Sequence, residues 1–271
     1  MSIIFGPIAS RRLGNSLGID LVKSKTCNLD CLYCEVGKTN ALTETRQTFI
    51  DLDALVTEIK ACPHKIDCLT LTGAGEPTLH KDIDKIIARL GADFNYPLVL
   101  ITNSLLLREE AVRQEILGLD IVMPSLDAVS QDVFETINKP VAGVLASDII
   151  EGLVRFRELF MGKIWLEILF VKGINDAPSE VLALKHAIER ICPDRIQLNT
   201  VVRMPAYKEG VEPVSIETLQ SIAEVLGFDN IDILSLKRGA STGQTLDSDE
   251  SEAIRFRRPD IEAVDIIQAP R

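Results

Sequence analysis

The chain has 271 residues, of which 46% are hydrophobic and 25% charged, and its formal net charge is −11. This size and apolar fraction suit one large α/β domain, and the acidic balance disfavours phosphate-driven binding of nucleic acid, which needs a basic face. No apolar run reaches the roughly 18 residues of a membrane span, and the first residues lack the basic and apolar regions of a secretory signal, so we expect a cytoplasmic protein.

Strand-like and helix-like runs alternate along almost the whole chain. Short apolar runs predict strands over residues 17–22, 66–72, 97–102, 119–125, 164–171, 195–201 and 231–236. Amphipathic runs predict helices over residues 51–61, 82–90, 109–117, 131–137, 146–160, 178–191 and 215–226. Near-continuous apolar strands between amphipathic helices are typical of a parallel sheet covered by helices. The pattern therefore predicts an α/β fold, a partial (βα)6 TIM-like barrel.

The predicted barrel has short N- and C-terminal extensions. We expect the barrel core with its N-terminal extension to occupy residues 1–236 and a C-terminal extension to occupy residues 237–271. Within the latter, residues 239–251 are the best candidate for a flexible link. Functional residues of such barrels lie on the loops that follow the carboxyl ends of the strands.

Three cysteines follow the first predicted strand. Cys27, Cys31 and Cys34 have the spacing Cys-x3-Cys-x2-Cys. Three thiolates this close can hold three irons of a cubane cluster and leave the fourth iron open to a small molecule. The spacing differs from a ferredoxin run and from a zinc site, which needs two pairs of ligands. Two other interpretations stay open, because Cys31 and Cys34 could form a redox pair or half of a zinc site.

The other cysteines are Cys62, Cys68 and Cys192. Cys68 lies in a predicted strand and is expected to be a buried structural thiol. Cys62 and Cys192 each precede a proline at the end of a predicted helix. A second metal site would require these three residues to converge in space.

Polar motifs follow the next three strands. The glycine-rich turn at residues 73–77 follows the second strand, and such a turn lets backbone groups approach a ligand closely. Asn103 follows the third strand, and Ser125 and Asp127 follow the fourth. Residues of these types also cap loops, so a purely structural role is the alternative.

Three further residues are candidates later in the chain. Glu167 is an acid inside an apolar strand, so it could point into the barrel, where a buried carboxylate needs a partner. Asn175, in the turn after that strand, could face a ligand or simply hold the turn. Arg203 follows the sixth strand, where it could anchor a carboxylate or phosphate or form a surface salt bridge.

These motifs resemble the radical S-adenosylmethionine (SAM) superfamily, through the cysteine triplet with Tyr33 directly before its third cysteine and the Gly-Glu-Pro turn. Within that superfamily the chain looks like the branch grouped with the wyosine-type tRNA-modifying synthases. The segments that carry the branch resemblance are residues 5–7, 10–14, 16–20, 73–80, 125–128, 137–140 and 173–176. Unlike those synthases, which hold a second cluster with upstream cysteines, this chain has no cysteine before Cys27.

The resemblance implies a 4Fe–4S cluster on Cys27, Cys31 and Cys34 that binds SAM at its open iron. One electron from the cluster would cleave SAM to methionine and a 5′-deoxyadenosyl radical, which takes hydrogen from an unidentified substrate. The resemblance, together with the strand-end positions, yields these cofactor-binding candidates: Tyr33, Ala74, Gly75, Glu76, Asn103, Ser125, Asp127, Glu167, Asn175 and Arg203.

The implied partners are an electron donor, such as a flavodoxin or ferredoxin, and the substrate. We expect the donor to dock on the locally basic N-terminal segment, which carries Arg11, Arg12, Lys23, Lys25 and Lys38. Three alternative functions stay open: wyosine-type modification of tRNA, activation of a glycyl-radical enzyme, and a non-catalytic iron–sulfur or zinc protein.

Overall fold

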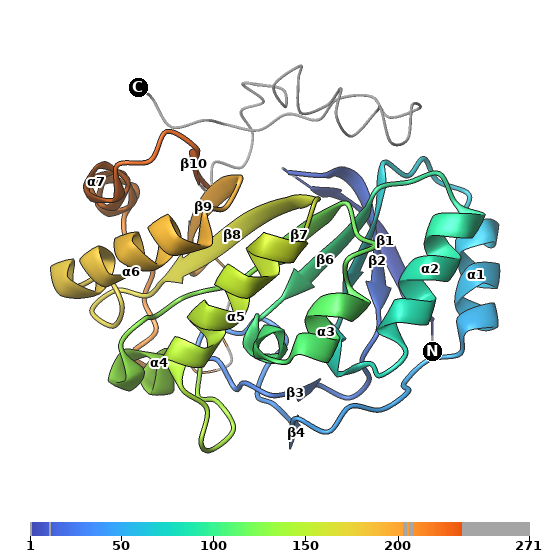
Figure 1. Cartoon of the computed structure of the whole chain (residues 1–271), viewed down its shortest axis with the longest axis horizontal. Helices are drawn as coiled ribbons and strands as arrows, with labels where there is room; N and C mark the ends of the chain where they lie inside the picture. The colour runs from blue at the N-terminus through green and yellow to red at the C-terminus, as the bar shows by residue number, and fades with distance from the viewer. Residues whose placement is uncertain (1, 11, 203–204, 206, 208, 235–271) are drawn as a thin grey trace.

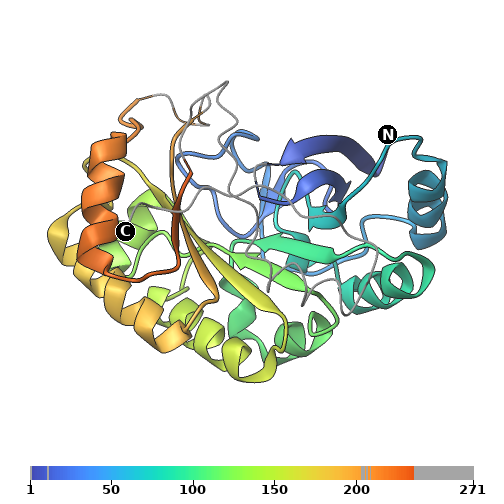
Figure 2. The same ribbon diagram turned by 90° about the horizontal axis from the view of Figure 1, so that it is seen from above.

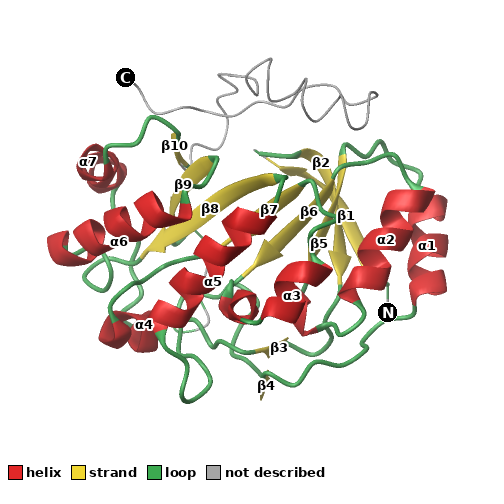
Figure 3. Cartoon of the chain, viewed as in Figure 1, coloured by secondary structure: helices red, strands yellow, loops and turns green. Residues whose placement is uncertain are grey.

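The computed structural model describes residues 2–10, 12–202, 205, 207 and 209–234. It contains one eight-stranded sheet with the order β1-β2-β5-β6-β7-β8-β9-β10 and a two-stranded parallel ribbon, β3–β4 (Figures 1 and 3). The strands are β1 Ile4–Ser10, β2 Gly14–Asp20, β3 Thr26–Cys27, β4 Ala41–Leu42, β5 Cys68–Thr72, β6 Leu98–Thr102, β7 Ile121–Pro124, β8 Lys163–Phe170, β9 Arg195–Thr200 and β10 Ile231–Ile233.

The helices cover the convex face of the curved sheet (Figure 2). They are α1 Leu52–Ala61, α2 Ile83–Asp93, α3 Glu110–Glu115, α4 Gln131–Ile137, α5 Ala146–Leu159, α6 Pro178–Ile191 and α7 Ile216–Leu226, with 3-10 helices η1 Pro77–Leu79 and η2 Leu105–Arg108. No helix in this described part of the chain is long and apolar enough to cross a membrane.

The predicted partial barrel is confirmed. All strands from β2 through β10 in the large sheet pair in parallel, and in the described residues the two edges, β1 and β10, do not pair to close it. The prediction missed β1, which is antiparallel to β2. The proposed C-terminal extension, residues 237–271, lies outside the described residues.

Apolar residues line both faces of the strands, which explains their near-continuous apolar sequences. On β8, Ile164, Leu166 and Ile168 belong to the main core under the helices. Trp165 belongs instead to a second cluster with Val99 and residues of neighbouring strands on the concave face. Because successive residues of a strand point to opposite faces, one apolar run supplies both layers.

Side-chain caps set the start of two helices where the sequence predicts them. The Asp51 carboxylate accepts a hydrogen bond from the backbone N–H of Ala54 at 2.8 Å at the start of α1. The Ser215 hydroxyl accepts one from Thr218 at 3.1 Å at the start of α7. Such caps satisfy N–H groups that have no partner within the helix.

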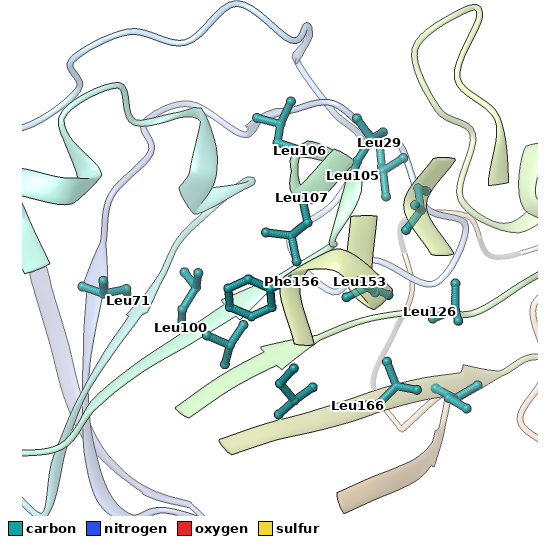
Figure 4. Packing of buried hydrophobic residues seen from close by; sticks show 14 of the residues in the cluster. Leu29, Leu71, Leu100, Leu105, Leu106, Leu107, Leu126, Leu153, Phe156 and Leu166 are labelled. Atoms are coloured by element: carbon teal, nitrogen blue, oxygen red, sulfur yellow. The ribbon is translucent and has the colours of Figure 1, made fainter. Parts of the chain in front are cut away.

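Helix α5 packs closely on the loop that follows β6. Leu153 and Phe156 of α5 lie against Leu107 and Leu100 in the core (Figure 4). A Cβ atom added to Gly152 would come within 2.7 Å of the Leu107 carbonyl oxygen. The approach of these two backbones therefore requires glycine at this helical position, despite its low helix propensity.

We predict that Gly152→Ala destabilises the protein, because the methyl group must push α5 away from the backbone at Leu107. Overpacking of this kind costs about 1–3 kcal/mol, more than alanine gains in helix propensity. Urea unfolding of the purified chain measures the effect. Glu158→Ala, at an exposed position of the same helix, is the control and should change the unfolding free energy by less than about 0.5 kcal/mol. Equal stability of the two variants would contradict this account.

Candidate functional site

The three predicted cysteine ligands lie together beyond the carboxyl ends of the parallel strands. Cys27 ends β3, which Figure 1 shows with β4 at that end of the sheet, and Cys31 and Cys34 lie in the loop that follows. Burial, with the nearby charges of Glu76 and Cys34, raises the pKa of the Cys27 thiol to about 11. Burial also raises the pKa of Cys31, with the charges of Asp127 and the other two cysteines contributing. The N–H of Cys34 donates to the carbonyl of Cys31 at 3.2 Å, which places these two cysteines in one turn.

Each of the three sulfurs accepts a hydrogen bond from a different side chain. Asn103 Nδ2 lies 3.6 Å from Cys27 Sγ, and Asn138 Nδ2 lies 3.4 Å from Cys31 Sγ. Lys25 Nζ lies 2.8 Å from Cys34 Sγ. Burial acts to lower the pKa of Lys25, but the hydrogen bond to Cys34 and the charges of the thiolates together raise it.

The glycine-rich turn after β5 supports the cysteine loop. The backbone N–H of Glu76 donates to the Thr26 carbonyl at 3.2 Å, and that of Ala74 donates to Asp20 at 3.0 Å. A Cβ atom on Gly75 would lie only 1.7 Å from the Thr26 carbonyl oxygen. Close backbone approach is thus the reason for this glycine, and the neighbour it approaches here is the residue before Cys27.

The Glu76 side chain joins two strand ends. Its carboxylate is 2% exposed and accepts hydrogen bonds from the N–H and hydroxyl of Thr78, the hydroxyl of Thr102 and the N–H of Asn103, at 2.7–3.1 Å. Burial raises the pKa of Glu76, although these donors oppose the rise. The Glu76 side chain therefore holds Asn103 beside Cys27. The role of Glu76 as a cofactor contact stays a prediction.

Asp127 is a second buried acid at this end of the sheet. It accepts hydrogen bonds from the Tyr33 hydroxyl, from Asn138 Nδ2 at 2.8 Å and from the N–H of Leu169 at 2.9 Å. Burial raises its pKa, against the effect of these donors. A small cavity beside it brings four of the predicted cofactor-binding residues together. That cavity is lined by Leu29, Tyr33, Asn103, Ser125, Leu126, Asp127, Ala128, Phe134, Asn138 and Ile149.

Glu167 finds its partner across the concave face. Arg12 Nη1 donates to Glu167 at 2.5 Å and to Gln197 at 2.7 Å, and Asn199 Nδ2 lies 3.4 Å from Glu167. The β1–β2 hairpin therefore reaches over to β8 and β9. This contact meets the expectation that a carboxylate in the barrel needs a partner.

The last two candidates differ in position. Asn175 is fully buried, and its amide accepts from the N–H of Val171 and donates to the carbonyls of Asp127 and Leu169, each at 2.8 Å. In the described structure it therefore holds the turn after β8, the structural alternative given above. Arg203 lies outside the described residues.

The remaining cysteines lie on separate elements. Cys62 caps the end of α1, Cys68 begins β5 and Cys192 caps the end of α6. Among the described residues, no three or more His, Cys, Asp or Glu side chains converge as ligands of a single ion. A cubane cluster does not need such convergence, because each thiolate binds its own iron.

The residues around the triplet fit an iron–sulfur cluster. Three thiols, each with an N–H donor, match a group whose sulfurs carry negative charge and accept hydrogen bonds. Asn28 is fully buried next to Cys27, and its Nδ2 has no hydrogen-bond partner within the described part of the chain. A buried donor of this kind costs free energy unless an acceptor is supplied, and a cluster sulfide would be such an acceptor.

Comparison with known proteins agrees with this chemistry. The model of the Radical SAM superfamily matches residues 21–184. The chain belongs to the radical SAM superfamily. The UPF0026 protein MJ1312 of Methanocaldococcus jannaschii is 34% identical over 248 residues, which cover 88% of this chain and 77% of that protein.

Two further matches differ in their extent. A Brachyspira hyodysenteriae protein named GTPase Obg is 34% identical over 264 residues, covering 95% of this chain but only 39% of that protein. The solved structure of TYW1 with a lysine-pyruvate adduct bound has a TM-score of 0.62 at 15% identity, covering 87% of this chain and 77% of that one. The TYW1 likeness shows the shared fold, as the resemblance predicts.

The sequence analysis did not identify three residues that lie at the site: Lys25, Asn28 and Asn138. Two of them lie within three residues of Cys27, so proximity to the triplet was an available signal. Asn138 lies more than 100 positions from Cys31 in sequence. Its motif at residues 137–140 contributed to the family resemblance, but nothing in the sequence indicated contact with a sulfur.

We predict that Gly75→Ala weakens both folding and metal binding, because its methyl group would displace the backbone at Thr26 and so move Cys27. The cost should reach at least about 1–3 kcal/mol. Urea unfolding, together with iron content after anaerobic reconstitution, measures the two effects. The control Ala74→Gly should cost no more than about 1 kcal/mol and keep its iron. Full iron content in Gly75→Ala would count against the contact.

Proposed function

We propose that this protein is a radical SAM enzyme in which Cys27, Cys31 and Cys34 hold a 4Fe–4S cluster. When bound, the cluster and SAM supply a 5′-deoxyadenosyl radical that takes a hydrogen atom from the substrate. The observation that supports this most directly is that each of the three cysteine sulfurs accepts a hydrogen bond from a side-chain N–H donor, beside a cavity lined by Tyr33 and Asp127.

In this proposal the polar strand ends orient SAM. Tyr33, Asn103, Ser125 and Asp127 share one cavity, and aromatic, amide, hydroxyl and carboxylate groups are suited to an adenine ring and to ribose hydroxyls. The backbone of Ala74 and Gly75 lies at the neighbouring turn. Glu76 and Asn175 contribute by holding the strand ends in place, since their side chains are already engaged.

The concave face would protect the radical from water. Val99, Ile121, Met123 and Trp165 form an apolar cluster on this face, and a reactive intermediate needs a site that excludes side reactions. Glu167 and Arg12 add a polar pair on the same side of the sheet. The net charge of −11 favours a small-molecule or modified-nucleotide substrate over tRNA.

The experiment that tests this function is anaerobic reconstitution with iron and sulfide, followed by dithionite and SAM. We expect the wild-type chain to bind a 4Fe–4S cluster and to form 5′-deoxyadenosine, and Cys31→Ala to form none, because one cluster ligand is lost. Cys192→Ala is the matched control, since this exposed cysteine caps α6, and it should behave as wild type. Stoichiometric zinc without iron, or equal cleavage by Cys31→Ala, would refute the proposal.

The electron donor would dock over the cysteine loop. Of the basic residues expected to form its docking surface, Lys38 lies in this loop, whereas Lys25 is buried beside Cys34 and Arg12 is paired with Glu167. Lys38 and Lys139 both lie over the ring of Tyr207, at 4.6 and 3.7 Å from its centre, and the Tyr207 hydroxyl donates to Asp30 at 2.5 Å. Asp30 itself lies between Cys27 and Cys31. These two cations fit an acidic flavodoxin or ferredoxin, because complementary charge speeds the encounter of redox partners.

We predict that the double variant Lys38→Glu/Lys139→Glu slows flavodoxin-driven SAM cleavage at low salt by about tenfold, through loss of electrostatic steering. The dithionite-driven rate should stay unchanged, because this small reductant needs no docking surface. Lys81→Glu, an exposed lysine outside the cysteine loop, is the control. A flavodoxin-driven rate equal to that of Lys81→Glu would place the docking surface elsewhere.

A further inference from the structure

The hydrogen-bond donors at the three cysteines come from three separate segments of the chain. Lys25 precedes the triplet, Asn103 follows β6, and Asn138 caps the end of α4. Each of these three side chains reaches a different sulfur, so segments that are distant in sequence meet at the triplet.

Other contacts fix the two asparagines in place. Asn103 donates its backbone N–H to Glu76, and its amide oxygen accepts from the N–H of Leu105 at 3.1 Å. The Asn138 amide is shared between Cys31 and Asp127, and the Asn138 carbonyl accepts from the N–H of Asp30 at 3.0 Å. The Asn103 Nδ2 group also donates to Asn28 Oδ1 at 2.6 Å, a shorter contact than its 3.6 Å approach to Cys27 Sγ. These contacts keep an N–H group of each amide beside a sulfur before any cluster binds.

Lys25 differs from these two because it carries a full charge. It is 8% exposed, although lysine is almost never buried without a partner, and its backbone adopts a left-handed φ of 48°. Removing an ammonium group from water costs several kcal/mol unless a negative partner compensates. The partner of Lys25 is Cys34 Sγ. The chain therefore places a buried positive charge beside the proposed cluster site.

We propose that Lys25, Asn103 and Asn138 are positioning residues that raise the reduction potential of the cluster, an inference that rests on the proposed function. Reduction adds one electron to the cluster and hence one negative charge. N–H groups and an ammonium fixed beside the sulfurs stabilise the reduced form more than the oxidised form. Lys25 should have the largest effect because of its charge, and Asn28 Nδ2, which is buried and unpartnered within the described residues, can add a fourth donor.

A redox titration of the reconstituted full-length chain, followed by electron paramagnetic resonance without SAM, tests this proposal. At the wild-type midpoint potential, Lys25→Met should lower the ratio of reduced to oxidised cluster at least tenfold, a negative shift of 59 mV or more for one electron. Asn138→Ala should shift the potential in the same direction by less. Lys25→Arg, which keeps the charge, should restore most of the wild-type potential.

The matched control is Lys23→Met, which removes the same charge from an exposed position two residues away. We expect its potential to stay close to wild type, because water screens an exposed charge. Iron content and thermal unfolding of every variant separate a change of potential from a loss of the cluster.

The outcomes separate the two proposals. A Lys25→Met cluster with full iron content and the wild-type potential would overturn this inference while leaving the proposed function intact. If Lys25→Met does not hold iron, the test is the potential of the Asn138→Ala cluster. A wild-type potential in Asn138→Ala would then overturn the inference. A wild-type chain that binds no cluster would refute the proposed function itself.

Discussion

The candidate site depends on one buried carboxylate, that of Glu76. It accepts four hydrogen bonds from Thr78, Thr102 and Asn103, so it joins the turn after β5 to the end of β6. On one side of this joint the Glu76 backbone supports the carbonyl of Thr26, the residue before Cys27. On the other, Asn103 reaches the Cys27 sulfur. A buried carboxylate that accepts this many hydrogen bonds is held in one position. Through Thr26 and Asn103 it supports the start of the cysteine loop.

The partial barrel makes this arrangement possible because its strands end at a common edge. Parallel pairing from β2 to β9 places the polar residues that follow β5, β6 and β7 side by side. Apolar side chains pack on both faces of these strands. This packing fixes the strands and therefore the positions of their carboxyl ends. The polar groups that would be costly in the core are thus collected at the end of the sheet, where they hydrogen-bond to one another and to the cysteine loop.

The sequence was sufficient to predict most of the scaffold, because strand and helix periodicity is a local property. Residues 131–137 and 178–191 form helices with the bounds that their patterns predict. It was insufficient for β1, whose outward residues are exposed and whose pairing depends on β2. For the site, the cysteines and strand-end residues were found from spacing. The contact of Asn138 with Cys31, and the engagement of Asn175 with backbone, depend on chain segments that meet only after folding.

The distribution of charge connects the sequence to the chemistry of the site. A chain with a net charge of −11 would by itself oppose the addition of an electron to a group inside it, because every acidic residue repels the new charge. Water screens charges on the surface, however, and this repulsion falls off within about 10 Å at ordinary ionic strength. The ammonium of Lys25, at 2.8 Å from Cys34 Sγ, lies in a region that water screens little. The donors around the cysteines act at the same short range as the buried carboxylates of Glu76 and Asp127. The potential of a cluster there would therefore depend on this local balance of charges more than on the acids at the surface.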